Sequence, residues 1–369
     1  MKKVLMYIGI TILCLLIGCF GMYLYISKHP ATFQKIITKS ERNVKIDDTG
    51  ISEAVDKVYD SVVTVSTYKN ASAYASGTGF VYKKSGNIAY ILTNAHVISN
   101  ADEVYVTFTN GSNEKVEVIG SNTMADIAVL SISSSKVIAY AEIGSSEKAK
   151  LGDTVFTVGA PLDSAYSWTV TRGIISGKDR LVEISQSNSN TRSLYNDSYL
   201  MNVIQTDAAI NSGNSGGPLA NGNGEVVGIT SLKLVSSGVE GMGFAIPIET
   251  AIKYAEKIIN KEEITTPYIG VSTLNINEAY YYREFRNIVE NLKEDKGVVI
   301  ATVESDSPAS KAGLKQGDVI TKIDNEDCKS IAYLRYVLYK HEVGNKIKIT
   351  YIRDGKENSA TVTLGKNKS

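Results

Sequence analysis

The sequence contains very little cysteine and histidine, with three residues of each in 369. Cys14 and Cys19 lie in an apolar N-terminal segment, and Cys328 stands alone near the other end of the chain. No two cysteines lie beside a histidine at the spacing of zinc ligands, so neither a disulfide framework nor a metal site is expected. The scarcity of histidine limits every mechanism that needs an imidazole to three candidates, which are His29, His96 and His341.

The chain also lacks an excess of charge of either sign. Lys and Arg together number 39, as do Asp and Glu, which gives a formal net charge of zero. No overall basic field exists to attract a phosphate backbone, so no nucleic-acid partner is expected. Hydrophobic residues make up 43% and charged residues 21%, a composition that is typical of folded proteins and excludes a mostly disordered chain.

Charge is absent from residues 4–26, which Lys2 and Lys3 precede and Lys28 follows. A helix of about 23 residues spans roughly 34 Å, enough to cross a hydrocarbon core of about 30 Å. We therefore predict a cytoplasmic tip and transmembrane signal anchor over residues 1–26 and a stalk over residues 27–50. The rest of the chain is then expected on the extracytoplasmic side of the cell membrane. A cleaved signal peptide, a lipoprotein lipidated at Cys19 and a buried core helix are the alternatives.

Three segments of different texture follow the stalk. Short β-branched runs separated by Gly, Asn and Ser recur over residues 51–246 and indicate an all-β barrel or sandwich. Apolar residues with a helical period predict a helical linker over residues 247–266. Residues 267–369 mix strands with helical stretches at 278–292 and 330–341, which indicates a separate α+β domain.

One glycine-rich segment, Gly213-Asn214-Ser215-Gly216-Gly217-Pro218-Leu219, carries the clearest chemical signal. A serine between glycines suits a tight turn that exposes the hydroxyl and lets backbone N–H groups converge on one point. Such convergence is what an oxyanion hole requires, and Gly213, Asn214 and Ser215 would form it. A serine hydroxyl becomes a nucleophile only when a base accepts its proton, and the usual base is a histidine oriented by a carboxylate.

His96 and Asp126 are the candidates for that base and that carboxylate. His96 ends an apolar strand, whereas His29 lies in the stalk and His341 ends a helix of the last domain. Asp126 begins an apolar run, where its side chain can be partly buried against an imidazole. Taken singly, each residue also fits a plain structural role, as a turn, core or capping residue. The order His, Asp, Ser along the chain is that of the chymotrypsin class.

Together these motifs resemble the trypsin-like serine proteases of the bacterial HtrA/DegP type. Gly77-Thr78-Gly79-Phe80 resembles the family's Gly-Ser-Gly-Phe segment, with Thr78 in place of Ser. The run Gly241-Met242-Gly243-Phe244-Ala245-Ile246-Pro247 is similar to the family's strand beside the specificity pocket. The resemblance implies a mainly β, chymotrypsin-like fold of two six-stranded β-barrels, with the triad in the cleft between them. It also implies a homo-oligomer, often a trimer, and a mechanism without metal or organic cofactor.

The segment around the specificity pocket supplies the expected substrate contacts. An extended substrate is expected to pair with an edge strand formed by Thr230, Ser231 and Leu232. Gly243 and Phe244 are expected to line the pocket itself. No Asp stands where it would select Lys or Arg, so small or medium apolar side chains are expected before the scissile bond.

The C-terminal segment resembles PDZ domains, since Tyr268-Ile269-Gly270-Val271 is similar to their carboxylate-binding loop. Backbone N–H groups there would capture the C-terminal carboxylate of a peptide that adds a strand alongside. The helix at 330–341 would form the other wall of the groove. A packing domain without a ligand is the alternative, and the cluster Tyr280-Tyr281-Tyr282 is a candidate to cover the groove.

The function favoured by the sequence is a membrane-anchored, ATP-independent serine endopeptidase. Its expected substrates are unfolded or misfolded extracytoplasmic proteins, in protein quality control and the stress response. No Gly-x-x-x-x-Gly-Lys-Ser/Thr loop for nucleotide binding is present. Two alternatives stay open: a PDZ-based peptide-binding adaptor or holdase chaperone, and a regulatory protease with one specific substrate.

Overall fold

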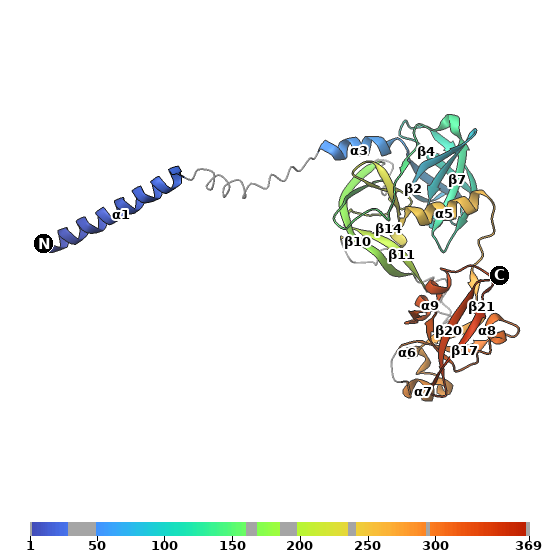
Figure 1. The fold of residues 1–369 in the computed structure, drawn as a ribbon. Helices are drawn as coiled ribbons and strands as arrows, with labels where there is room; N and C mark the ends of the chain where they lie inside the picture. The colour runs from blue at the N-terminus through green and yellow to red at the C-terminus, as the bar shows by residue number, and fades with distance from the viewer. Residues whose placement is uncertain are drawn as a thin grey trace. The chain divides into compact units, whose positions relative to one another are not determined.

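A computed structural model describes residues 2–28, 49–159, 168–184, 198–234, 241–292 and 296–366. Contacts divide the chain into two units, residues 1–48 and 49–369. The described part of the first unit is helix α1 (Lys2–Lys28) (Figure 1). Among the helices of the described ranges, none combines the length and the apolar character needed to cross a membrane. The expected stalk falls almost entirely on residues 29–48, which lie outside the described residues.

The second unit begins with helix α3 (Thr49–Tyr59), which packs the buried side chains of Ala54 and Val58 against the β-structure. A seven-stranded antiparallel sheet follows, in the order β5-β4-β1-β2-β3-β7-β6. Its strands are β1 (Val62–Lys69), β2 (Ser72–Ser85), β3 (Ile88–Thr93), β4 (Glu103–Thr107), β5 (Asn113–Lys115), β6 (Glu117–Asn122) and β7 (Ile127–Ser133). The family resemblance implied six strands here. The difference arises because residues 113–122 form two short strands, on opposite edges of the sheet.

The second sheet closes on itself, because β12 pairs with both β9 and β13. Six of its strands form this closed ring, as expected for a six-stranded barrel, and β8 adds to β13 as a parallel edge. The strands are β8 (Glu142–Ile143), β9 (Thr154–Gly159), β10 (Thr169–Ile184), β11 (Tyr199–Thr206), β12 (Pro218–Asn221), β13 (Glu225–Thr230) and β14 (Gly243–Pro247).

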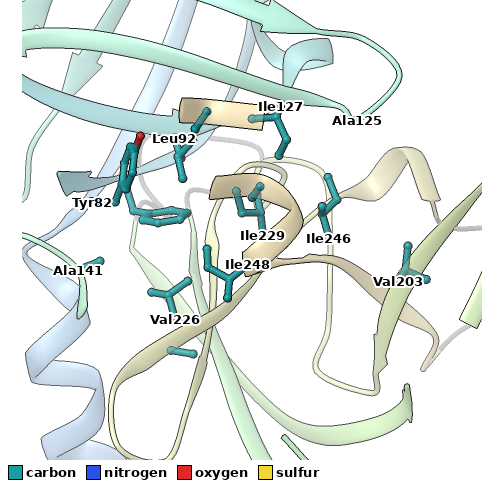
Figure 2. Packing of buried hydrophobic residues seen from close by; sticks show 14 of the residues in the cluster. Tyr82, Leu92, Ala125, Ile127, Ala141, Val203, Val226, Ile229, Ile246 and Ile248 are labelled. Carbon is teal, nitrogen blue, oxygen red and sulfur yellow. The ribbon is translucent and has the colours of Figure 1, made fainter. Parts of the chain in front are cut away.

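One hydrophobic cluster joins the two sheets, and we call it the joint core (Figure 2). Leu92 and Ile127 enter it from the first sheet, and Ile229 and Ile246 from the second. Helix α5 (Ile248–Ile259) contributes a buried stripe at the period of an α-helix, formed by Ile248, Ala251, Ala255 and Ile258. Because α5 contacts strands of both sheets, the helix predicted as a linker also packs against the two sheets where they meet (Figure 1).

The C-terminal part is an α+β domain around the sheet β16-β17-β18-β20-β21, with β19 beside β18 and a separate β15–β22 pair. Its strands are β15 (Pro267–Tyr268), β16 (Val271–Asn275), β17 (Val298–Val303), β18 (Val319–Ile323), β19 (Glu326–Asp327), β20 (Lys346–Arg353), β21 (Lys356–Thr363) and β22 (Gly365–Lys366). Its helices are α6 (Ile276–Ala279), α7 (Arg283–Glu290), α8 (Pro308–Lys311) and α9 (Ile331–Leu338).

The two faces of this sheet are covered by different segments, because alternate residues of a strand point to opposite faces. Val298 and Ile300 of β17 pack in the cluster that includes α9, whereas Val299 packs with Phe285 of α7. The segment around the tyrosine cluster therefore covers the face opposite α9, and the interpretation that it covers the peptide groove was wrong. Phe285 is the reason, since its buried ring holds α7 on that face, while Tyr281 is 80% exposed.

Candidate active site

Two neighbouring strands bring His96 and Asp126 together. β3 and β7 are antiparallel, with Thr93 opposite Ala128, so the end of β3 lies beside the start of β7. His96 follows β3 in a single helical turn, α4 (Ala95–Ile98), and Asp126 immediately precedes β7. The buried Asn94 side chain fixes this junction by donating from Nδ2 to the Asp126 carbonyl at 2.9 Å.

The Asp126 carboxylate is buried, at 1% exposure, and three donors satisfy it. The backbone N–H of His96 donates to Oδ1 at 3.0 Å, and His96 Nδ1 lies 2.8 Å from Oδ2. The Ser231 hydroxyl donates to Oδ2 at 2.9 Å. A buried carboxylate is an acceptor only, so Nδ1 carries the proton in this pair and Nε2 is left as the base. Asp126 holds this geometry at φ +55°, a left-handed conformation that Asp and Asn tolerate better than most residues.

Ser215 lies in the turn before β12 and is 5% exposed. Asn214 N–H donates to the Asn211 carbonyl at 3.0 Å, and Gly213 has φ +103°. A positive φ at the third residue of such a turn is the mark of type II, which needs glycine there. Gly216 is also required, because a Cβ at its φ of +86° would lie 2.2 Å from the Thr78 carbonyl oxygen.

The backbone N–H groups of Gly213 and Ser215 are available for a ligand. In the part of the chain that the structure describes, neither N–H donates to a protein acceptor. The predicted oxyanion hole therefore has two free donors on the turn that carries the serine. Asn214 lies between these two donors, where its N–H closes the turn and its side-chain Nδ2 donates to the Ala209 carbonyl at 3.3 Å.

The Ser215 hydroxyl oxygen accepts a hydrogen bond from the Leu232 N–H at 3.0 Å. Among the hydrogen bonds of the described residues, none joins Ser215 to His96. Leu232 begins a short 3-10 helix, η3 (Leu232–Leu234), so it does not extend β13 as predicted. The N–H of its first residue is the donor to the serine oxygen.

The other expected substrate contacts have different roles in the structure. Thr230 is fully buried, and its N–H donates to the Gly217 carbonyl at 2.9 Å, so it offers no free edge. Ser231 reaches Asp126, as described above. Phe244 packs in the joint core, and its carbonyl accepts from the Ser231 N–H at 3.1 Å. In the structure each of these three residues supports the triad region, and their contact with substrate stays a prediction.

Gly243 does lie beside a candidate pocket residue, Ile210, that the sequence pattern did not predict. A Cβ on Gly243 would lie 2.6 Å from Ile210 Cγ1, so the isoleucine side chain fills the space that a larger residue would take. The only signal in the sequence is an apolar residue shortly before the glycine-rich turn, which differs from the charged residue that would select Lys or Arg.

The predicted carboxylate loop of the C-terminal domain has the geometry of an anion cradle. Gly270 has φ +80°, and a Cβ there would lie 2.2 Å from Ser307 Cβ. Within the described residues, the N–H groups of Ile269 and Gly270 donate to no protein acceptor. The Tyr268 hydroxyl is hydrogen-bonded to Glu304, and burial followed by this bond raises the pKa of Tyr268 to about 12.

The strand after this loop, β16, is at the edge of its sheet, so its outer backbone groups can pair with an added strand. Asn275 at the end of β16 accepts from the Ile331 N–H of α9 at 2.9 Å, which ties the strand to the helix on one side. The predicted strand, loop and helix of a peptide groove are therefore all present. Within the described ranges, no three His, Cys, Asp or Glu side chains gather as metal ligands.

Comparisons with known proteins agree with both parts of the chain. The model of the trypsin-like peptidase domain matches residues 77–229, and that of the PDZ domain matches residues 267–364. The serine protease Do-like HtrA of Lactobacillus helveticus is 41% identical over 329 residues, which cover 86% of this chain and 76% of the relative. Its counterpart from Bacillus subtilis is 38% identical over 341 residues, covering 88% of this chain and 74% of the relative.

Solved structures give the same result. The serine endoprotease from Yersinia pestis matches with a TM-score of 0.63 and 29% identity, over 86% of this chain and 98% of that one. The HtrA-type protease AlgW with decapeptide matches with a TM-score of 0.65 and 28% identity, over 86% of this chain and 99% of that one.

The buried bond from Ser231 to Asp126 is expected to stabilise the fold. Ser231→Ala removes a donor from a buried carboxylate, and a hydrogen bond to a charged group contributes about 1.5–3 kcal/mol. The free energy of unfolding should fall by about that amount in urea titrations that follow the fluorescence of Trp168, the single tryptophan of the chain. Trp168 reports on the right region because it packs against the joint core.

Ser133→Ala is the matched control, because Ser133 is exposed and its hydroxyl is hydrogen-bonded, among the described residues, only to the exposed Ser135 hydroxyl, at 2.9 Å. It should change the free energy of unfolding by less than about 0.5 kcal/mol. Equal effects of the two substitutions would contradict a special contribution of the Asp126 bond.

Proposed function

Because the chain belongs to the HtrA family of trypsin-like serine proteases and is a serine endopeptidase, we propose that His96, Asp126 and Ser215 form its catalytic triad. The observation that carries the proposal is the buried Asp126 carboxylate, 2.8 Å from His96 Nδ1. This contact fixes the imidazole tautomer whose Nε2 is free to act as a base. A buried carboxylate without hydrogen-bond donors around it would cost free energy of folding.

The reaction follows from these positions. Ser215 Oγ attacks the peptide carbonyl carbon while its proton moves to His96 Nε2, and the imidazolium that forms is stabilised by Asp126. The N–H groups of Gly213 and Ser215 bind the oxygen that becomes negative. The imidazolium then gives its proton to the leaving amine, which leaves an acyl-enzyme. A water molecule deprotonated by the same imidazole hydrolyses the acyl-enzyme and releases the second product.

The triad predicts a steep and non-additive loss of activity. Ser215→Ala removes the nucleophile and His96→Ala removes the base, so each should lower kcat on the order of 10⁵–10⁶-fold by analogy with subtilisin. The double variant should be little worse than either single one, because the residues act as a unit. The measurement is hydrolysis of a chromogenic peptide by the purified full-length chain.

Asp126→Asn tests the carboxylate without disturbing the backbone, because Asn also tolerates a positive φ. It should lower kcat by about 10⁴-fold, by analogy with the corresponding change in trypsin, because the amide favours the wrong imidazole tautomer. Turnover by Ser215→Ala within tenfold of the parent chain would refute the triad, whereas peptide binding without turnover by the parent chain would favour the adaptor or holdase hypothesis.

We also propose that the endopeptidase acts without ATP on unfolded or misfolded extracytoplasmic proteins. The names of the relatives support proteolysis, and the apolar contact of Ile210 with Gly243 favours small or medium apolar side chains before the scissile bond. Digestion of casein beside a tightly folded protein, with the cut sites sequenced, tests both points. Rapid cleavage of one folded protein and no cleavage of casein would favour a regulatory protease with one specific substrate.

The PDZ domain supports peptide binding, and we propose that the occupant is a peptide C-terminus held by the loop from Tyr268 to Val271. Gly270→Val should lower the affinity of the chain for a fluorescent peptide with a free C-terminal carboxylate by at least about tenfold, because a Cβ there meets Ser307. The same peptide with an amidated C-terminus should bind the parent chain weakly. Equal binding of the two peptides would contradict capture of a carboxylate.

We keep the N-terminal membrane anchor over residues 1–26 as a proposal that rests on the uncharged run at residues 4–26. Full-length protein should stay in the membrane fraction after carbonate extraction, and protease added to intact cells should remove the catalytic domain. Protection of that domain until cells are lysed would contradict an extracytoplasmic location. The homo-oligomer implied by the family resemblance, often a trimer, stays a prediction that the mass of the solubilised protein would test.

The domain limits predicted from the sequence also stay proposals: a protease domain over residues 51–246, a helical linker over 247–266 and a PDZ domain over 267–369. If limited proteolysis cleaves the chain inside residues 62–159 earlier than it cleaves the linker, these domain limits are contradicted.

A further inference from the structure

Two buried threonine hydroxyls hold the carbonyl groups of the turn that carries Ser215. Thr230 Oγ1 donates to the Asn214 carbonyl at 2.6 Å, and Thr78 Oγ1 donates to the Gly213 carbonyl at 2.6 Å. Both threonines are fully buried. Thr78 comes from β2 of the first sheet and Thr230 from β13 of the second, so the turn is hydrogen-bonded to both sheets.

The bond from Thr230 determines where the Ser215 N–H points. The Asn214 carbonyl and the Ser215 N–H belong to one planar trans peptide, in which the two groups point in opposite directions. Thr230 holds the carbonyl, so the N–H of the same peptide is directed away from Thr230, toward the open side of the turn. This N–H is one of the two that donate to no protein acceptor in the described part of the chain.

The bond from Thr78 fixes the neighbouring peptide. The Gly213 carbonyl accepts from Thr78, and the N–H of that same peptide, on Asn214, donates to the Asn211 carbonyl at 3.0 Å. The peptide is therefore held at both ends, and it closes the type II turn in which the Gly213 N–H is presented. Glycine has the widest backbone freedom of any residue, so the turn needs such external restraints to keep one conformation.

A second layer holds Thr78 in place. The Thr78 N–H donates to the Ser215 carbonyl at 2.9 Å, and the Thr78 carbonyl accepts from the Thr93 hydroxyl at 2.7 Å. Thr93 is itself buried at the end of β3, three residues before His96. The position of the histidine and the shape of the serine turn are thereby set by the same strand.

We propose that Thr78 and Thr230 are positioning residues of the oxyanion hole, whose hydroxyls aim the two N–H donors by holding the carbonyls of the turn. The proposal rests on the proposed triad, because it assigns the aim of donors that act only if Ser215 is the nucleophile. It makes the hydroxyl, rather than the volume of the side chain, the feature that the reaction needs. Serine at either position would keep the hydroxyl donor. Valine would keep the volume of the side chain but remove the hydroxyl donor.

The experiment compares Thr78→Val, Thr78→Ser, Thr230→Val and Thr230→Ser in the purified full-length chain. Each Val variant should lower kcat for a chromogenic peptide by about 10–100-fold, less than the 10²–10³-fold cost of deleting a donor, because the N–H is misdirected and not removed. KM should change by less than about threefold, and each Ser variant should recover kcat to within about threefold of the parent chain.

Two further measurements separate aim from stability. A peptide trifluoromethyl ketone, whose adduct places a negative oxygen in the hole, should lose affinity for each Val variant by the same factor as kcat. Thr157→Val is the matched control, because Thr157 is fully buried in the same barrel and its hydroxyl has no partner within the described residues. This control should leave kcat within about twofold of the parent value.

Several outcomes would overturn the proposal. Val variants that fold and keep kcat within threefold would show that the hydroxyls do not aim the donors. Ser variants as weak as the Val variants would show that the methyl group matters instead. If a Val variant does not fold, Thr→Cys at the same position takes its place, because it keeps a similar volume with a weaker donor. Its kcat should lie between that of the Ser variant and zero. A kcat equal to that of the parent chain would contradict the proposal.

Ser215→Ala, measured in the same assay, separates failure of the proposed triad from failure of the positioning role of the threonines. An active Ser215→Ala protein would refute the proposed triad. An inactive one beside fully active Val variants would refute only the positioning role of the threonines.

Discussion

The buried carboxylate of Asp126 is the constraint on which the rest of the site depends. A charge at 1% exposure is tolerated only when donors surround it, and those donors come from both sheets. His96 approaches from the end of β3 in the first sheet, whereas Ser231 approaches from the end of β13 in the second. Two donors come from His96 and the third from Ser231, so the full set is complete only when the sheets are docked. Docking of the sheets therefore adds the last donor to the carboxylate that orients the imidazole.

The sequence was sufficient to propose the three polar residues of the site, because histidine is rare and only His96 lies in the β-rich part. It also predicted the β-rich domain, the connecting helix and the α+β domain, since periods of two and of 3.6 residues are local properties. Local patterns did not show that Leu232 leaves the strand. The run Thr230-Ser231-Leu232 directly follows the β-branched run of β13, and the bond from the Leu232 N–H to Ser215 Oγ that accompanies the 3-10 helix is a tertiary contact that no local pattern contains.

The residues that have structural contacts beyond those expected from the sequence share a physical cause. Thr230, Ser231 and Phe244 are near the cleft in sequence terms, but burial directs each of them inward, toward the turn, the carboxylate or the joint core. A hydroxyl has the same appearance in a sequence whether it meets substrate or holds a carbonyl. The tyrosine cluster gave the same ambiguity, and one buried ring, that of Phe285, settled which face its segment covers.

The serine turn shows how a flexible segment becomes a rigid donor array. Gly213, Gly216 and Gly217 give the turn little order of its own, and fixing each residue costs about 1–2 kcal/mol of backbone entropy. Hydrogen bonds from β2 and β13 offset that cost by engaging the carbonyls on one side. Because a trans peptide directs its N–H opposite to its carbonyl, anchoring the Asn214 carbonyl leaves the Ser215 N–H exposed on the other side. The anchored Gly213 carbonyl belongs to the peptide whose N–H, on Asn214, closes the turn. Gly216 is needed because a Cβ there would lie 2.2 Å from the Thr78 carbonyl oxygen.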